Sequence, residues 1–170
     1  MKYPLHSALS VIAIAGLLSA CGGGGGDFQN DTRSSGQTAS LTVSSSGDTD
    51  LNGVYSSSDV FLNDVEKVNP IGGEPETCRT RFSGLRQAGT TRTMDGDIRY
   101  IPGSSEVRTT FVSIDTVEFR LQQGPGVTVN RGNNVVTYTG AVLTSTQGTG
   151  RTITLTGTVP LRAANKPEGC

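Results

Sequence analysis

The stretch Thr-Ile-Thr-Leu-Thr-Gly-Thr-Val at residues 152–159 decides the fold class. Its apolar residues Ile153, Leu155 and Val159 alternate with four threonines. Because successive side chains of an extended chain point to opposite faces, this spacing gives one apolar face and one hydroxyl face. Threonine and β-branched residues are also favoured in strands. The stretch therefore predicts a β-strand with one face on a core and the other in water.

Similar patterns recur towards the amino terminus. Residues 134–146 and 116–121 alternate, and residues 107–114 carry apolar side chains in both parities, as expected of a strand covered on both faces. Residues 91–101 and 77–85 complete the predicted strands.

Turn signals separate these strands at short intervals. Asp95-Gly96 and residues 124–126, 131–134 and 147–150 contain the glycine and asparagine that tight turns favour. About seven short strands with no helical crossover predict an all-β fold. We favour an antiparallel β-sandwich, and a small barrel is the alternative.

Residues 53–68 leave two alternatives open. Phe61, Val65 and Val68 recur at helical spacing, with Ser58 available as a cap, which favours one short helix over residues 58–68. The competing prediction is a strand over residues 53–62.

The first twenty residues have the layout of a secretory signal. Lys2 precedes an apolar run over residues 8–18 that is too short for a membrane span. The sequence Leu-Ser-Ala-Cys at residues 18–21 resembles the lipobox of bacterial lipoproteins, in which an aliphatic residue and two small residues precede a cysteine.

This resemblance implies a lipid anchor. In that class the cysteine thiol receives fatty acyl chains and the signal is removed, so Cys21 would become the first residue of the mature chain. Several acyl chains are needed for stable anchoring, since one chain binds a membrane marginally. Gly22 rather than aspartate follows the cysteine, which in this class implies the outer membrane, with the protein facing the periplasm or the outside.

Composition divides the rest of the chain into two parts. Residues 21–50 begin with an unbroken glycine run at 22–26 and continue with polar residues, which predicts a flexible tether after the lipidated cysteine. Residues 41–43 within it are a short strand or part of the linker, and we favour the linker. Residues 51–170 predict one β-rich globular domain.

Removal of the signal also removes the sole histidine, His6. A mature chain without histidine excludes Ser-His-Asp and Cys-His nucleophile systems and histidine-based metal sites. We therefore expect no enzyme activity, no cofactor and no metal. With Lys2 gone, 13 basic residues face 15 acidic ones, a balance that argues against a nucleic-acid partner.

Cys78 and Cys170 remain as an even pair once Cys21 is lipidated. In an oxidising compartment a disulfide between them is the natural prediction. Free thiols, a mixed disulfide and a bridge to another chain are the alternatives.

Two charged or polar patterns have functional interpretations. Arg79, Arg81, Arg99 and Arg108 are candidates for a patch that binds a phosphate-bearing lipid or an anionic glycan. We favour the alternative that they decorate a solvated sheet face among balancing carboxylates. The threonine row of residues 152–158 suggests a hydroxyl array, but such an array needs repetition on several flat strands. We favour the alternative that these threonines occupy the water-facing side of a single strand.

These features together predict a cell-envelope lipoprotein that acts as a non-enzymatic binding or structural module. Its partners would be the membrane, through the lipid anchor, and another envelope protein, docked by strand addition at an exposed sheet edge. The alternative is a small barrel that carries an apolar ligand. A carboxylate-based glycoside hydrolase is a third hypothesis.

Overall fold

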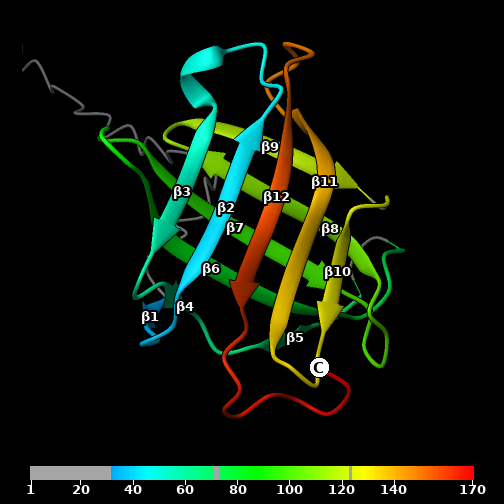
Figure 1. The fold of residues 1–170 in the computed structure, drawn as a ribbon. Helices are drawn as coiled ribbons and strands as arrows, with labels where there is room; N and C mark the ends of the chain where they lie inside the picture. Colours follow the sequence, from blue (N-terminus) through cyan, green and yellow to red (C-terminus); the bar gives the residue numbers. More distant parts are fainter. Residues whose placement is uncertain (1–31, 71–72, 123) are drawn as a thin grey trace, which may run out of the picture.

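Eight antiparallel strands close into a barrel in the computed structural model, which describes residues 32–70, 73–122 and 124–170 (Figure 1). The barrel strands are β2 (Ala39–Ser44), β3 (Gly53–Ser57), β6 (Thr77–Gln87), β7 (Thr93–Tyr100), β8 (Val107–Ile114), β9 (Val117–Gln122), β11 (Val135–Ser145) and β12 (Thr152–Pro160). Each barrel strand pairs with the next one along the chain, and β12 pairs with β2 to close the ring. The all-β prediction is confirmed, in its barrel alternative.

Short elements are added to this ring. They are β1 (Arg33–Ser34), β4 (Phe61–Leu62), β5 (Glu66–Val68), β10 (Val127–Asn130) and the 3-10 helix η1 (Thr49–Leu51). The strands β5, β4 and β3 pair in turn along one edge of the long strand β6. The strand β10 follows β9 in the chain, and both pair antiparallel with β11.

The predicted tether ends earlier than composition suggested. Residues 39–44 form β2, which is hydrogen-bonded to β12 on one side and β3 on the other. Leu41 and Val43 are buried inside the barrel, and β1 also lies within the predicted tether. The boundary at residue 50 is therefore wrong. Residues 1–31, with the predicted signal, Cys21 and the start of the tether, lie outside the described residues.

The helix predicted over residues 58–68 is also wrong. This segment forms β4 and β5, and its burial has a period of two, since Val60 and Leu62 are fully buried while Phe61 between them is 43% exposed. The helical spacing of Phe61, Val65 and Val68 does not correspond to a buried face. The alternative strand over residues 53–62 is present in part, as β3 and β4.

Large side chains occupy the barrel interior. Tyr55, Tyr138 and Phe82 are at most 1% exposed. The buried hydroxyls are paired, because Tyr55 donates to the Leu51 carbonyl at 3.1 Å and the Tyr138 hydroxyl lies 3.0 Å from Thr110 Oγ1. Burial raises the pKa of Tyr138. These two tyrosine hydroxyls are therefore satisfied by partners within the protein.

The turn predicted at Asp95-Gly96 lies instead in the middle of β7. Gly96 is required there by packing, because a Cβ on this residue would lie 2.3 Å from Cε1 of Phe82. The neighbouring strand β6 shifts register between Phe82 and Leu85, and the Gly84 N–H donates to Asp95 Oδ1 at 2.9 Å. Glycine thus makes room for an aromatic ring rather than for a turn.

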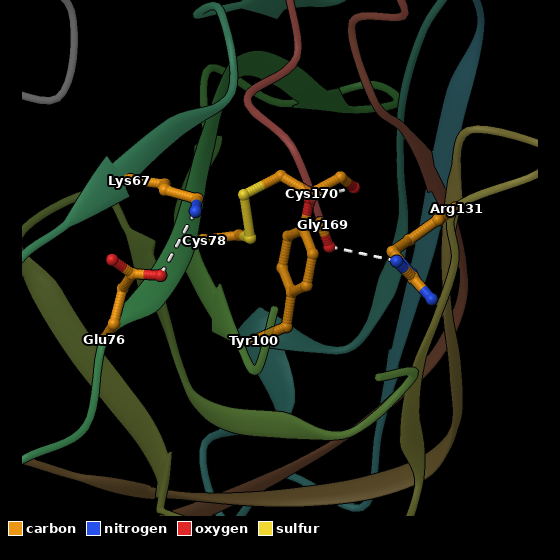
Figure 2. The surroundings of a disulfide bond; sticks show 7 residues. All are labelled: Lys67, Glu76, Cys78, Tyr100, Arg131, Gly169 and Cys170. Carbon is orange, nitrogen blue, oxygen red and sulfur yellow. Dashed lines mark hydrogen bonds and ion pairs between the residues drawn. A yellow bond between two sulfur atoms is a disulfide. The ribbon is translucent and has the colours of Figure 1, made fainter. Parts of the chain in front are cut away.

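The carboxyl-terminal segment is tied to the barrel end where β7 and β12 end and β6 begins. Cys78 and Cys170 form a disulfide with a Cα–Cα distance of 5.6 Å, so the predicted pairing is confirmed. Figure 2 shows Tyr100 and Arg131 converging on the last two residues. The Tyr100 hydroxyl donates to the Cys170 backbone oxygen at 3.0 Å and Arg131 Nη1 donates to the Gly169 carbonyl at 3.0 Å. Burial raises the pKa of Tyr100 to about 12.

Removing this disulfide should lower the free energy of unfolding. The bridge joins residues 92 positions apart, and the chain-entropy model gives about 4–5 kcal/mol for a loop of this length. We expect the Cys78→Ser/Cys170→Ser variant to unfold at a clearly lower urea concentration than the oxidised protein. Reduced wild-type protein should match the variant, and equal unfolding midpoints for all three samples would contradict this prediction.

Candidate functional site

A groove of about 270 Å³ lies on the outside of the barrel, over β7, β8 and β9. Its other wall is formed by residues 68–69, 74–75 and 77. The groove is lined by Val68, Asn69, Glu74, Pro75, Thr77, Arg99, Arg108, Thr109, Phe111, Arg120 and Gln122. Three of these side chains are guanidinium groups and one is an aromatic ring.

Phe111 lies under two of the arginines. Strand register places it beside Arg120 on β9 and beside Asp97 on β7. The guanidinium carbon of Arg120 lies 5.2 Å from the ring centroid, and that of Arg99 lies 5.7 Å from it, so both make cation–π contacts. An apolar residue on the outer face of β8 is thus covered by cations rather than by another layer of chain.

A β-bulge brings Arg108 to the same face. Tyr100 pairs with Val107 and Arg99 pairs with Thr109, so Arg108 is the extra residue on β8. A bulge of this kind re-aims a side chain that regular alternation would direct inward. Arg108 then reaches across the groove, where its Nε donates to Glu74 Oε2 at 2.8 Å.

Asp97 is the buried carboxylate beside the groove. Its side chain is 3% exposed and accepts from Arg79 Nε at 2.6 Å and from Arg99 Nε at 3.2 Å. Because a buried charge is tolerated when paired and hydrogen-bonded, the two guanidiniums hold Asp97 in place and are held by it. Arg99 is thereby fixed with its guanidinium near the ring of Phe111.

The four predicted arginines divide into two pairs. Arg99 and Arg108 line the groove. Arg79 and Arg81 lie beside it on β6, 3.5 Å and 3.6 Å from Oε1 of Glu66. Arg120 was not among the predicted site residues, because an outward arginine on residues 116–121 is typical of an ordinary strand surface.

Arg120 differs from the other groove arginines in its partners. Its Nε makes a 3.4 Å hydrogen bond to Thr109 Oγ1. No carboxylate in the described part of the chain lies within ion-pair distance of it. The groove therefore carries three guanidiniums against Glu74 and the buried Asp97, an excess of positive charge suited to an anion that presents a flat or apolar part to Phe111.

The opposite side of the barrel has a different surface. The threonine row of β12 is repeated on its neighbours, since Thr158 pairs with Thr137 on β11 and with Ser40 on β2. The strands β2, β3, β10, β11 and β12 contain no charged residue (Figure 1). Hydroxyl residues thus continue from β12 onto β11 and β2, but on strands of a closed barrel rather than on a flat sheet, and the charged groups of the barrel strands lie on β6 to β9.

The chain matches no protein-family model, no curated protein and no solved structure. In the part of the chain that the structure describes, no helix has the length and apolar character needed to cross a bilayer. Nor do three His, Cys, Asp or Glu side chains of that part come together as a metal site.

We expect Asp97→Asn to destabilise the protein, because two guanidiniums would lose their buried carboxylate partner. The cost should be about 2–3 kcal/mol, below the value for a fully buried pair since both arginines are partly exposed. Asp115→Asn is the matched control, because Asp115 is an exposed partner of Arg92 and should cost under about 1 kcal/mol. Urea unfolding compares the two variants, and equal losses would refute the role given to Asp97.

Proposed function

We propose that this chain is a lipid-anchored, non-enzymatic binding module of the bacterial cell envelope, with the groove over Phe111 as its site for an anionic ligand. The observation that carries the proposal is the groove itself, where Arg99, Arg108 and Arg120 surround one aromatic ring. Guanidiniums bind phosphate and carboxylate groups through paired donors, and the ring accepts a flat or apolar part of the same ligand.

The anchor is supported by the sequence alone. The lipobox-like residues 18–21 and the glycine run after Cys21 suit a protein held at a membrane by a lipid and a tether. A groove rich in arginine suits the envelope, where phosphate-bearing lipids and anionic glycans are abundant. The outer membrane remains the proposed location.

Transport of an apolar ligand inside the barrel is less well supported. Five aromatic side chains fill the interior, each at most 1% exposed: Tyr55, Tyr100, Tyr138, Phe82 and Phe119. An apolar ligand inside the barrel would have to displace these aromatic side chains, whereas the groove on the outside of the barrel is already open.

Two other hypotheses also receive less support than the groove. A glycoside hydrolase needs two carboxyl groups that face one substrate, while Glu74 is the sole carboxylate among the groove residues described above. Docking by strand addition needs a free sheet edge. Closure of the barrel leaves such edges on the short strands β1, β5 and β10 in the described part of the chain.

Arg120→Gln should weaken binding of an anionic ligand, because it removes the guanidinium that has no carboxylate partner. A hydrogen bond to a charged group contributes about 1.5–3 kcal/mol, so we expect the affinity to fall about tenfold or more. The measurement is calorimetric titration of the full chain in neutral detergent with short-chain phosphatidic acid.

Arg151→Gln is the charge-matched control, since Arg151 lies on the β11–β12 turn beside Thr149 and Asp48. It should leave the affinity unchanged. Short-chain phosphatidylcholine should bind weakly to all forms. Binding that tolerates Arg120→Gln, or that does not distinguish the two lipids, would contradict the proposed site.

Cys21→Ser tests the anchor. Without the thiol no acyl chain can be attached, so the variant should leave the membrane fraction or accumulate with its signal uncleaved. Fractionation followed by mass measurement distinguishes these products from the acylated protein. Unchanged membrane association and mass would refute lipidation at this residue.

A further inference from the structure

The contact between Glu74 and Arg108 has the geometry of a bound anion. Oε2 of Glu74 lies 2.8 Å from Arg108 Nε and 2.8 Å from Arg108 Nη2. Two donors of one guanidinium converge on a single carboxylate oxygen, and a charge-assisted contact of this kind is equally available to a phosphate oxygen. Glu74 thus fills, from within the chain, a position where a ligand anion would be held.

The position of Glu74 leaves its carboxylate open to replacement. Its side chain is 52% exposed, whereas that of Arg108 is 25% exposed. Ion pairs with such an exposed member add little to stability. A ligand that makes the same contact and adds others can therefore displace it.

Charge indicates which ligand gains by that exchange. A monocarboxylate ligand carries the same single negative charge as Glu74, so replacing Glu74 with it would add no electrostatic attraction at Arg108. A phosphate monoester is close to a dianion at neutral pH and offers three acceptor oxygens. The additional charge and acceptors suit Arg120, which has no ion-pair partner in the described part of the chain.

We propose that the position of the Glu74 carboxylate is the anion subsite of the groove, that it takes a phosphate monoester, and that Glu74 is its internal competitor. This inference rests on the proposed function and names the ligand class of the same site. A lipid headgroup and a sugar phosphate can both carry a phosphate monoester. The proposal therefore names the ligand class and not the molecule that carries it.

The test compares two neutralising variants of the full chain. Glu74→Gln removes the competitor, and we expect it to raise the affinity for inorganic phosphate about two- to fivefold, the range set by an exposed ion pair. Glu76→Gln is the matched control. It makes the same change of net charge, and Glu76 pairs with Lys67 at 3.2 Å and does not line the groove. Its affinity should equal that of the wild type.

The titrations are run by phosphorus NMR at pH 8 and constant ionic strength, and the affinity for acetate, the monocarboxylate, is measured by its displacement of bound phosphate. At pH 5, where inorganic phosphate is a monoanion, binding should weaken. Equal gains for Glu74→Gln and Glu76→Gln, or acetate binding as tightly as phosphate, would overturn the inference. So would the absence of phosphate binding by both the wild type and Glu74→Gln.

These failures differ from failure of the proposed function. If phosphatidic acid still binds in an Arg120-dependent manner, the groove remains an anion site and the role of Glu74 alone is rejected. Parallel titrations with a sugar phosphate and with short-chain phosphatidic acid then identify the source that binds more tightly.

Discussion

Pairing between β2 and β12 is the constraint on which the remaining structure depends, because it turns a meander of strands into a closed ring. Five residue pairs form this seam, with Leu155 opposite Val43 and Gly157 opposite Leu41. The backbones approach so closely that a Cβ on Gly157 would lie 2.2 Å from the Ser40 carbonyl oxygen. Closure pairs the backbone N–H and C=O groups at the edges of β2 and β12. It also curves the sheet, so that the outer faces of β7, β8 and β9 form one continuous surface.

Alternating and β-rich patterns were enough to predict β6 to β9, β11 and β12, because each contributes an apolar face to the core, whereas β10 was not predicted. At β2 the polar composition around Leu41 and Val43 favoured a linker over a strand, but these two residues become buried through a partner more than 100 residues away. The groove was predictable in part. Arginines were found as a cluster, but the roles of Phe111, Arg120 and Glu74 depend on register and on the bulge at Arg108, which no local pattern encodes.

The barrel separates two kinds of chemistry on one scaffold. Uncharged hydroxyl residues cover the outer side of β2, β3 and β10 to β12, while the arginines and their carboxylates lie on β6 to β9. Buried Asp97 stabilises this arrangement, since it holds Arg79 and Arg99 in neighbouring positions on the surface. The arginine-rich side can therefore exist on a chain whose acidic and basic residues nearly balance.

The contacts that hold β1 have a mechanical consequence under the proposed amino-terminal anchor. Arg162 Nη2 donates to the carbonyls of Arg33, Ser34 and Leu62 at 3.0–3.2 Å, and Arg33 pairs with Asp64 at 2.6 Å. A pulling force applied from the amino-terminal side would act on the contacts of Arg162 and Arg33 before it acts on β2. The two-residue strand β1 pairs only with β4 in the described part of the chain, so its contacts can break one after another. In contrast, β2 is hydrogen-bonded to β12 on one side and to β3 on the other. Under the proposed anchor we therefore expect the contacts around β1 to break before the pairing between β2 and β12 does.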